Sequence, residues 1–370
     1  MNKSLEGLRG AAALIIVLFH LQFSVQALDA AQGGYLAVDL FFVLSGFVIC
    51  RAYDGRITHR SEWFAFMLRR FGRLYPANIV TTLAYFALLY FGPLYSAMPQ
   101  ANGHTHITSL ADLVPALTMT NGLPISGEVV GLPVTWSTSN EFYVYMLFGL
   151  LCLVLRARAR VAAFATLAFV GYAAAVYASL VTHACVTTGW CYDMVGDYGW
   201  ARCFAGFFIG VLIAKYRERP VIVSFGRPLT QVLALTLVLA VILSGARITA
   251  LAAPIVFAVL VASLSSDKGP VARLFSLRVF QWLGALSYSV YLAHDLFRPY
   301  LNIAAASAHT ADERVLIGIA FLLASFACAY VLHKYIESPW RARFARWSRG
   351  HQESRGSLVP SNTVSATDNG

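Results

Sequence analysis

The feature that most constrains the fold is a series of apolar runs, each long enough to cross a lipid bilayer. A helix rises 1.5 Å per residue, so about 20 apolar residues cross a hydrocarbon core roughly 30 Å thick. We expect about ten such spans, at 8–28, 35–53, 76–95, 134–155, 161–182, 198–216, 229–245, 248–266, 279–299 and 313–335. The predicted fold class is an all-α polytopic membrane protein.

Composition agrees with this prediction. Hydrophobic residues make up 58% of the chain and charged residues only 12%, whereas about a quarter of a soluble domain is charged. The net charge of +10 could suggest nucleic-acid binding. That function needs one contiguous basic face, and here the arginines fall in short clusters between apolar runs. We therefore expect the lipid bilayer, and no nucleic acid, as a partner.

The basic clusters predict the orientation of the helices. They lie at 69–73, 156–160, 215–220, 267–278 and 340–349 and alternate with loops that are nearly free of Lys and Arg, including the long loop 96–133. Basic loops stay in the cytoplasm, so both termini are expected there. Residues 346–370 are mostly polar or small. We interpret them as a disordered cytoplasmic tail that follows a transmembrane domain at 1–345.

The cysteines fall into two groups. Four lie within apolar runs and are expected to serve packing: Cys50, Cys152, Cys203 and Cys328. Cys185 and Cys191 share a short polar segment, and they would form a disulfide if that segment faced an oxidising compartment. The sequence leaves pairing and free thiols equally open.

Five ionisable residues lie inside the expected spans: His20, Asp39, Glu141, Arg202 and His294. Each costs a few kcal/mol to place in a membrane, so each is a functional candidate. Counting from the span ends puts all five in the outer half, which predicts one cavity open to the outside. A purely structural role remains an alternative for each of the five residues. For example, His20 could be a hydrogen-bonded core histidine, and Arg202 could neutralise Asp39 or Glu141.

A second group of charges lies at the cytoplasmic side. Arg9 precedes His20 by eleven residues, which places both on one helix face about 16 Å apart. The segment "RRFGRLYP" contributes Arg69, Arg70 and Arg73 just before Pro76, where we expect a helix to begin. Arginine donates two hydrogen bonds to a phosphate at once. These arginines therefore predict a cytoplasmic anion site, and a pure topology signal is the alternative.

Together the two groups suggest a donor with a phosphorylated head and a long thin arm, which is the shape of acyl-CoA. Because imidazole titrates near neutral pH, a histidine can take a proton from a hydroxyl that attacks a thioester, while a carboxylate orients the ring. The sequence contains no Walker loop, dinucleotide fingerprint, zinc-ligand spacing or G-x-S-x-G motif. We therefore expect no metal.

Six segments also resemble the acyltransferase-3 family of integral-membrane bacterial O-acyltransferases, over about positions 4–345. They are "LEGLRGAAALIIVLFH", "VDLFFVLSGFVI", "RRFGRLYP", "TWSTSNEFYVY", "LGALSYSVYLAHDLF" and "YIESPWR". Any one of them is weak evidence, but six in the family's order are specific. The sequence departs from the family at Asn140, where a small apolar residue is usual. It also lacks the hydrolase-like domain fused to some members, so a stand-alone enzyme is expected.

The resemblance implies transfer of an acyl group, most often acetyl, from cytoplasmic acyl-CoA to a hydroxyl of a surface or exported glycan or glycolipid. It places the protein in the bacterial inner membrane. We expect His20 to be the general base and Glu141 to orient it or to stabilise its imidazolium form. The expected CoA-phosphate ligands are Arg9, Arg69, Arg70 and Arg73, and the expected acceptor-pocket residues are Asp39, Trp136, Ser137, Arg202 and His294.

The rival hypothesis is a secondary transporter or flippase that uses the same charges as a substrate or proton pathway. Such a protein is expected to show two related halves with broken helices, and we find no such repeat. The sequence does not identify the acceptor hydroxyl.

Overall fold

The computed structural model describes residues 2–22, 32–92, 109–125, 129–245 and 247–356, and these contain helices and no strand. The all-α fold class is therefore confirmed for this part of the chain. Within it, five helical segments are long and apolar enough to cross a membrane: Lys3–Gln22, Gln32–Tyr53, Arg60–Phe91, Ala157–Thr182 and Ala311–Arg349.

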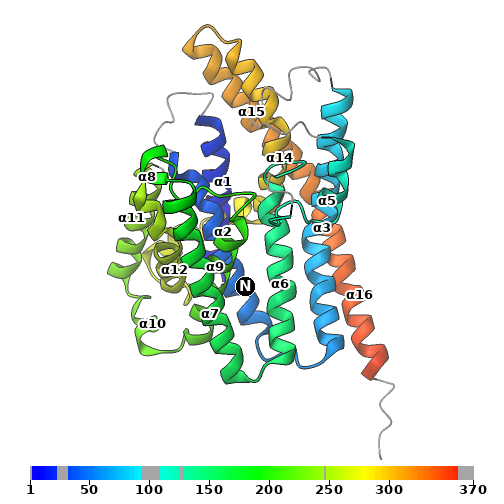
Figure 1. The fold of residues 1–370 in the computed structure, drawn as a ribbon, viewed down its shortest axis with the longest axis vertical. Coiled ribbons are helices and arrows are strands. Elements are labelled where there is room, and N and C mark those ends of the chain that lie inside the picture. The colour runs from blue at the N-terminus through cyan, green and yellow to red at the C-terminus, as the bar shows by residue number, and fades with distance from the viewer. Residues whose placement is uncertain (1, 23–31, 93–108, 126–128, 246, 357–370) are drawn as a thin grey trace, which may run out of the picture.

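Each expected span coincides with a helix. The first five are α1 (Lys3–Gln22), α2 (Ala37–Tyr53), α3 (Arg60–Phe91), α6 (Thr135–Val154) and α7 (Ala157–Tyr177), which continues as the π-helix η3 (Ala178–Thr182). The others are α9 (Gly199–Tyr216), α11 (Pro228–Leu243), η4 with α12 (Ile248–Ala252, Ala253–Ser263), α14 (Arg278–Ala306) and α15 (Ala311–Leu332). Figure 1 shows α3, α6 and α16 on one side of the molecule and α7, α9, α11 and α12 on the other.

Short helices occupy the connections: η2 (Leu110–Asp112), α5 (Leu113–Leu117), α8 (Cys185–Thr188), α10 (Pro220–Ser224) and α13 (Pro270–Phe275). The predicted loop 96–133 is described only at 109–125 and 129–133, and the end of the first expected span, 23–28, lies outside the described residues. The structure pairs Cys185 with Cys191 in a disulfide.

Two boundaries differ from the expected ones. Helix α3 begins at Arg60 and not at Pro76, which lies inside it. A proline removes one backbone hydrogen bond, a loss that neighbouring groups offset in membrane helices. At the other end, α15 continues through the π-helix η5 (His333–Glu337) into α16 (Ser338–Gly356), so helix replaces the first part of the expected tail. Residues 357–370 lie outside the described residues.

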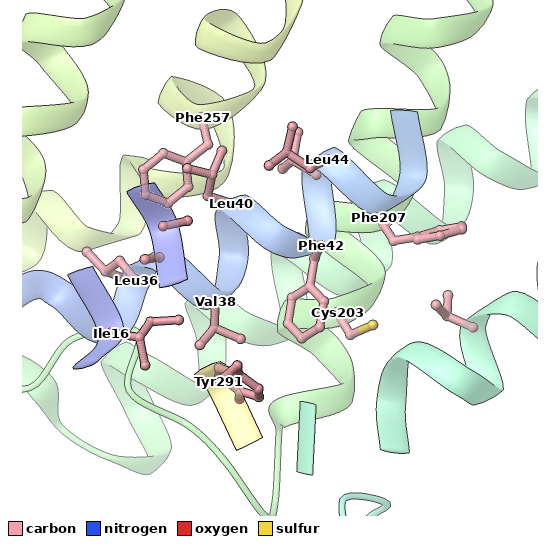
Figure 2. Packing of buried hydrophobic residues seen from close by; sticks show 14 of the residues in the cluster. Ile16, Leu36, Val38, Leu40, Phe42, Leu44, Cys203, Phe207, Phe257 and Tyr291 are labelled. Atoms are coloured by element: carbon pink, nitrogen blue, oxygen red, sulfur yellow. The ribbon is translucent and has the colours of Figure 1, made fainter. Parts of the chain in front are cut away.

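Glycines set the closest helix contacts. A Cβ atom on Gly46 of α2 would lie 1.8 Å from the carbonyl oxygen of Phe207 in α9, and one on Gly210 would lie 2.1 Å from that of Val43. Small residues let membrane helices approach closely in this way. Helix α2 is thereby enclosed, and Figure 2 shows its Leu40, Phe42 and Leu44 among side chains of α9 and α12.

Glycines also allow close contact between α1 and α14. A Cβ atom on Gly10 would lie 2.4 Å from the backbone nitrogen of Gly284, and one on Gly284 would lie 2.3 Å from the carbonyl oxygen of Glu6. Helices α1 and α14 therefore run in contact along their length. This contact brings the polar residues of the two helices together.

Candidate functional site

A cavity of about 560 Å³ lies between α1, α2, α3, α6 and α14. Along α2 it extends from Arg51 to Val38, about 20 Å at the helical rise. The end near Arg51 also holds Arg9, Arg70 and Arg73. The middle is lined largely by apolar side chains, and the other end closes at Ser137 and Tyr291. We call this space the arginine cavity.

The arginines of this cavity differ in how they are neutralised. Arg73 forms an ion pair with the buried Glu337, and Arg9 forms one with Glu6. Arg70 is paired with no acidic side chain of the described residues. Its guanidinium lies 5.5 Å from the ring centroid of Tyr53, and its Nε is buried without a hydrogen-bond partner. Arg70 therefore offers an unneutralised charge to an anion.

Arg69 does not line the arginine cavity, contrary to its expected place among the phosphate ligands. It donates hydrogen bonds to the Tyr53 hydroxyl at 3.1 Å and to the Ser348 hydroxyl at 2.9 Å. Neighbouring residues of a helix point about 100° apart, so Arg69 and Arg70 face different surroundings. Of the four predicted phosphate ligands, Arg9, Arg70 and Arg73 therefore line the arginine cavity and Arg69 does not.

Beyond the closed end of the cavity lies a pair of histidines. The Nε2 atom of His294 is 3.2 Å from the Nδ1 atom of His20, and the ring of Tyr291 is 6.0 Å from that of His294. His294 is buried and His20 is partly buried. Tyr291 thus both lines the arginine cavity and lies beside the histidine pair.

The backbone fixes the tautomers of both rings. The Nδ1 atom of His20 lies 3.0 Å from the carbonyl oxygen of Ile16, and that of His294 lies 3.0 Å from the carbonyl oxygen of Val290. A carbonyl oxygen only accepts, so each Nδ1 carries the proton. The Nε2 of His294 can then accept from His20. In this tautomer the Nε2 of His20 carries no proton and can accept one, as a general base must.

The carboxylate beside the histidines is Asp295, whose oxygen lies within 4.8 Å of a nitrogen of each ring. It also pairs with Arg298 at 2.8 Å and accepts the Val134 N–H at 3.1 Å. Both oxygens of Asp295 thus already have partners, the Arg298 guanidinium and the Val134 N–H. Asp295 and Arg298 were not among the predicted site residues, although both lie within an expected span and the rule for buried ionisable groups applies to them.

Glu141 lies elsewhere than expected. It lines the arginine cavity and accepts hydrogen bonds from the hydroxyls of Ser45, at 2.6 Å, and Tyr145. No hydrogen bond joins it to His20 among the described residues. The structure therefore does not support the expectation that Glu141 orients His20, and the carboxylate near both rings is Asp295. Glu141 is placed to contact whatever enters the arginine cavity.

Asp39 and Arg202 form a separate, fully buried ion pair. Arg202 donates to both carboxylate oxygens of Asp39, at 2.6 and 3.2 Å, and its guanidinium lies 5.2 Å from the ring centroid of Trp136. Neither charged residue lines the arginine cavity. A buried guanidinium needs such a carboxylate. The five ionisable residues therefore form three clusters and not the single outward cavity expected from their depth. Of the other acceptor candidates, only Ser137 lines the cavity.

The acyltransferase-3 family model, described as an acyltransferase domain, matches residues 2–334. The peptidoglycan O-acetyltransferase OatA of Listeria monocytogenes is 22% identical over 95% of this chain and 57% of that protein. Protein 2 in the picA locus of Rhizobium radiobacter is 34% identical over 39% of this chain and 79% of that protein.

Acyltransferase MdmB of Streptomyces mycarofaciens is 33% identical over 40% of this chain and 38% of that protein. The chain thus spans little more than half the length of OatA and a smaller part of MdmB. No solved structure matches it.

Proposed function

The chain belongs to the acyltransferase-3 family, and on that premise we propose that it transfers an acyl group from acyl-CoA to a hydroxyl of a glycan. The observation that carries this proposal is one cavity with an unneutralised Arg70 at one end and the His20–His294 pair just beyond the other. Acetyl is the favoured acyl group, since OatA is named an O-acetyltransferase.

Arg9, Arg70 and Arg73 bind the phosphates of acyl-CoA at the cytoplasmic end. The buried, unpartnered Nε of Arg70 supports this fit, because a guanidinium without an acidic partner favours an anionic ligand. The arm then lies along the apolar middle of the arginine cavity, beside Glu141 and Ser45. Tyr291 has to move for the acyl end to reach His20.

His20 acts as the general base. Its Nε2 accepts the proton of the acceptor hydroxyl as that oxygen attacks the acyl carbon. His20 then gives the proton to the sulfur as the carbon–sulfur bond breaks, which restores the neutral ring. His294 and Asp295 hold the ring and favour its charged form at the moment of attack.

We propose that the protein crosses the bacterial inner membrane ten times and has both termini in the cytoplasm. The cationic ends of α3, α14 and α16 support this orientation. The Cys185–Cys191 disulfide at the opposite end supports it too, because disulfides persist in oxidising compartments.

Purified protein in vesicles, given labelled acetyl-CoA on the cytoplasmic face and a glycan, tests the function. His20→Ala should abolish transfer at an unchanged protein level. Arg70→Ala should raise KM for acetyl-CoA about tenfold or more, the loss of a charged hydrogen bond, while the neighbouring Arg69→Ala changes it little. Glycan transport by the wild type without acylation would support the transporter hypothesis instead.

A further inference from the structure

A second cavity, of about 400 Å³, lies at the end of the molecule opposite the arginines. It is lined by Gln32 before α2, by Trp190, and by Leu243, Ser244 and Arg247 after α11. Arg51 of the arginine cavity lies near the other end of α2. In the proposed orientation this outer cavity faces the compartment from which an exported glycan is reached.

Trp190 is held in a fixed position in this cavity. The disulfide closes the loop from Cys185 to Cys191, and the hydroxyl of Tyr35 donates to the carbonyl oxygen of Cys191. Gly189 has φ +83°, which lets the chain turn just before the tryptophan. The indole is 37% exposed. The loop therefore presents a rigid aromatic surface to solvent.

Arg247 adds a positive charge beside the indole. It is exposed, and no acidic side chain of the described residues pairs with it. Outer loops of membrane proteins are poor in arginine, and most arginines of this chain lie at the other end. Its place next to Trp190 therefore points to an anionic ligand that also has an apolar face.

The outer cavity is connected to the histidine pair through packed rings. Trp190 lies 6.0 Å from Tyr35, Tyr35 lies 5.7 Å from Phe19, and Phe19 lies 5.0 Å from His20, measured between ring centroids. A ligand bound at Trp190 would thus be separated from His20 by two side chains. This suits a remote unit of a polymer whose accepting unit lies nearer to His20.

We infer that the outer cavity binds a carboxylate-bearing sugar unit of the acceptor, an inference that rests on the proposed function. The indole stacks on the C–H face of the sugar ring. Arg247 pairs with the carboxylate through two hydrogen bonds, and Gln32 and Ser244 contact hydroxyls. A saccharide with an acidic substituent fits these groups better than a neutral one.

Binding of two disaccharides to the wild-type protein in nanodiscs tests the site. One probe is N-acetylglucosaminyl-N-acetylmuramic acid, which carries a carboxylate, and the other is neutral chitobiose. We expect the acidic probe to bind at least tenfold more tightly. Arg247→Gln should remove that difference, and Trp190→Ala should weaken both probes. Arg314→Gln, a partly exposed arginine outside the cavity, is the control and should change neither.

Equal binding of the two probes, or binding unaffected by both cavity variants, would overturn the inference. So would an effect of Arg247→Gln that appears only in anionic lipid, since it would make this arginine a headgroup contact. Failure of this binding site can be distinguished from failure of the proposed function. Failure of acyl transfer with intact probe binding rejects the reaction, whereas normal transfer with an unchanged acceptor KM in Trp190→Ala rejects the site.

Discussion

Replacing Asp39 with alanine tests whether the Asp39–Arg202 pair supports the fold or binds substrate. Arg202 is 1% exposed and Asp39 is 0% exposed. The change removes two of the four hydrogen bonds of the guanidinium and leaves those to Met194 and Tyr35, at 3.0 and 3.4 Å. A buried charge left without its partner costs about 3–5 kcal/mol. The free energy of unfolding should fall by that amount.

The double variant Asp39→Leu/Arg202→Met should recover most of this loss, because it leaves no buried charge. Denaturant titration of the detergent-solubilised protein measures both effects. Glu218→Ala is the matched control, since Glu218 is 84% exposed in its pair with Arg217 and such a pair contributes at most about 1 kcal/mol. Unchanged unfolding of Asp39→Ala, together with a raised acceptor KM, would refute a structural role.

Three further changes test other parts of the molecule. His294→Gln should lower kcat about tenfold or more and shift its pH profile, with KM for acetyl-CoA unchanged; steady-state kinetics in vesicles would measure this. Gly46→Ala should lower the free energy of unfolding by about 1–3 kcal/mol or more, since its Cβ would overlap the Phe207 carbonyl group; an unaltered denaturation curve would contradict the close packing. Partial burial alone would raise the pKa of Asp267, but hydrogen bonds from the Ser4 and Lys3 backbone outweigh it and lower this pKa. The stabilisation from Asp267 is therefore present above the ordinary aspartate pKa and is lost as the pH falls through the lowered pKa. Hydrogen exchange at the start of α1 should rise over this pH range in the wild type, and this rise should be absent in Asp267→Asn.

The helices were predictable because hydropathy is a local property. Each apolar run became a helix, and the main error came from Pro76, where a rule for helix starts overrode the continuing pattern. That error had a consequence for the site. With Arg69 and Arg70 placed in a loop, nothing distinguished them, whereas inside a helix their directions differ and only Arg70 lines the arginine cavity.

The residues of the site were easier to find than their partners. His20 and His294 were both candidates because ionisable groups are costly in a membrane, but they are 274 positions apart and meet only because Gly10 and Gly284 let α1 and α14 touch. The carboxylate partner was misassigned for the same reason. Glu141 was the expected neighbour of His20, while Asp295, next to His294 in the chain, occupies that place.

The closed end of the arginine cavity also matters for the proton gradient across the membrane. Tyr291 donates a hydrogen bond to the Val134 carbonyl oxygen at 2.8 Å and lies 2.7 Å from the Ser137 hydroxyl. A bacterial membrane stores a proton gradient, and a continuous file of water past a neutral imidazole would dissipate it. A tyrosine held by two partners interrupts such a file in the resting protein. In the proposed reaction, opening of this barrier only while the acyl arm fills the gap would keep the membrane closed to protons during each turnover.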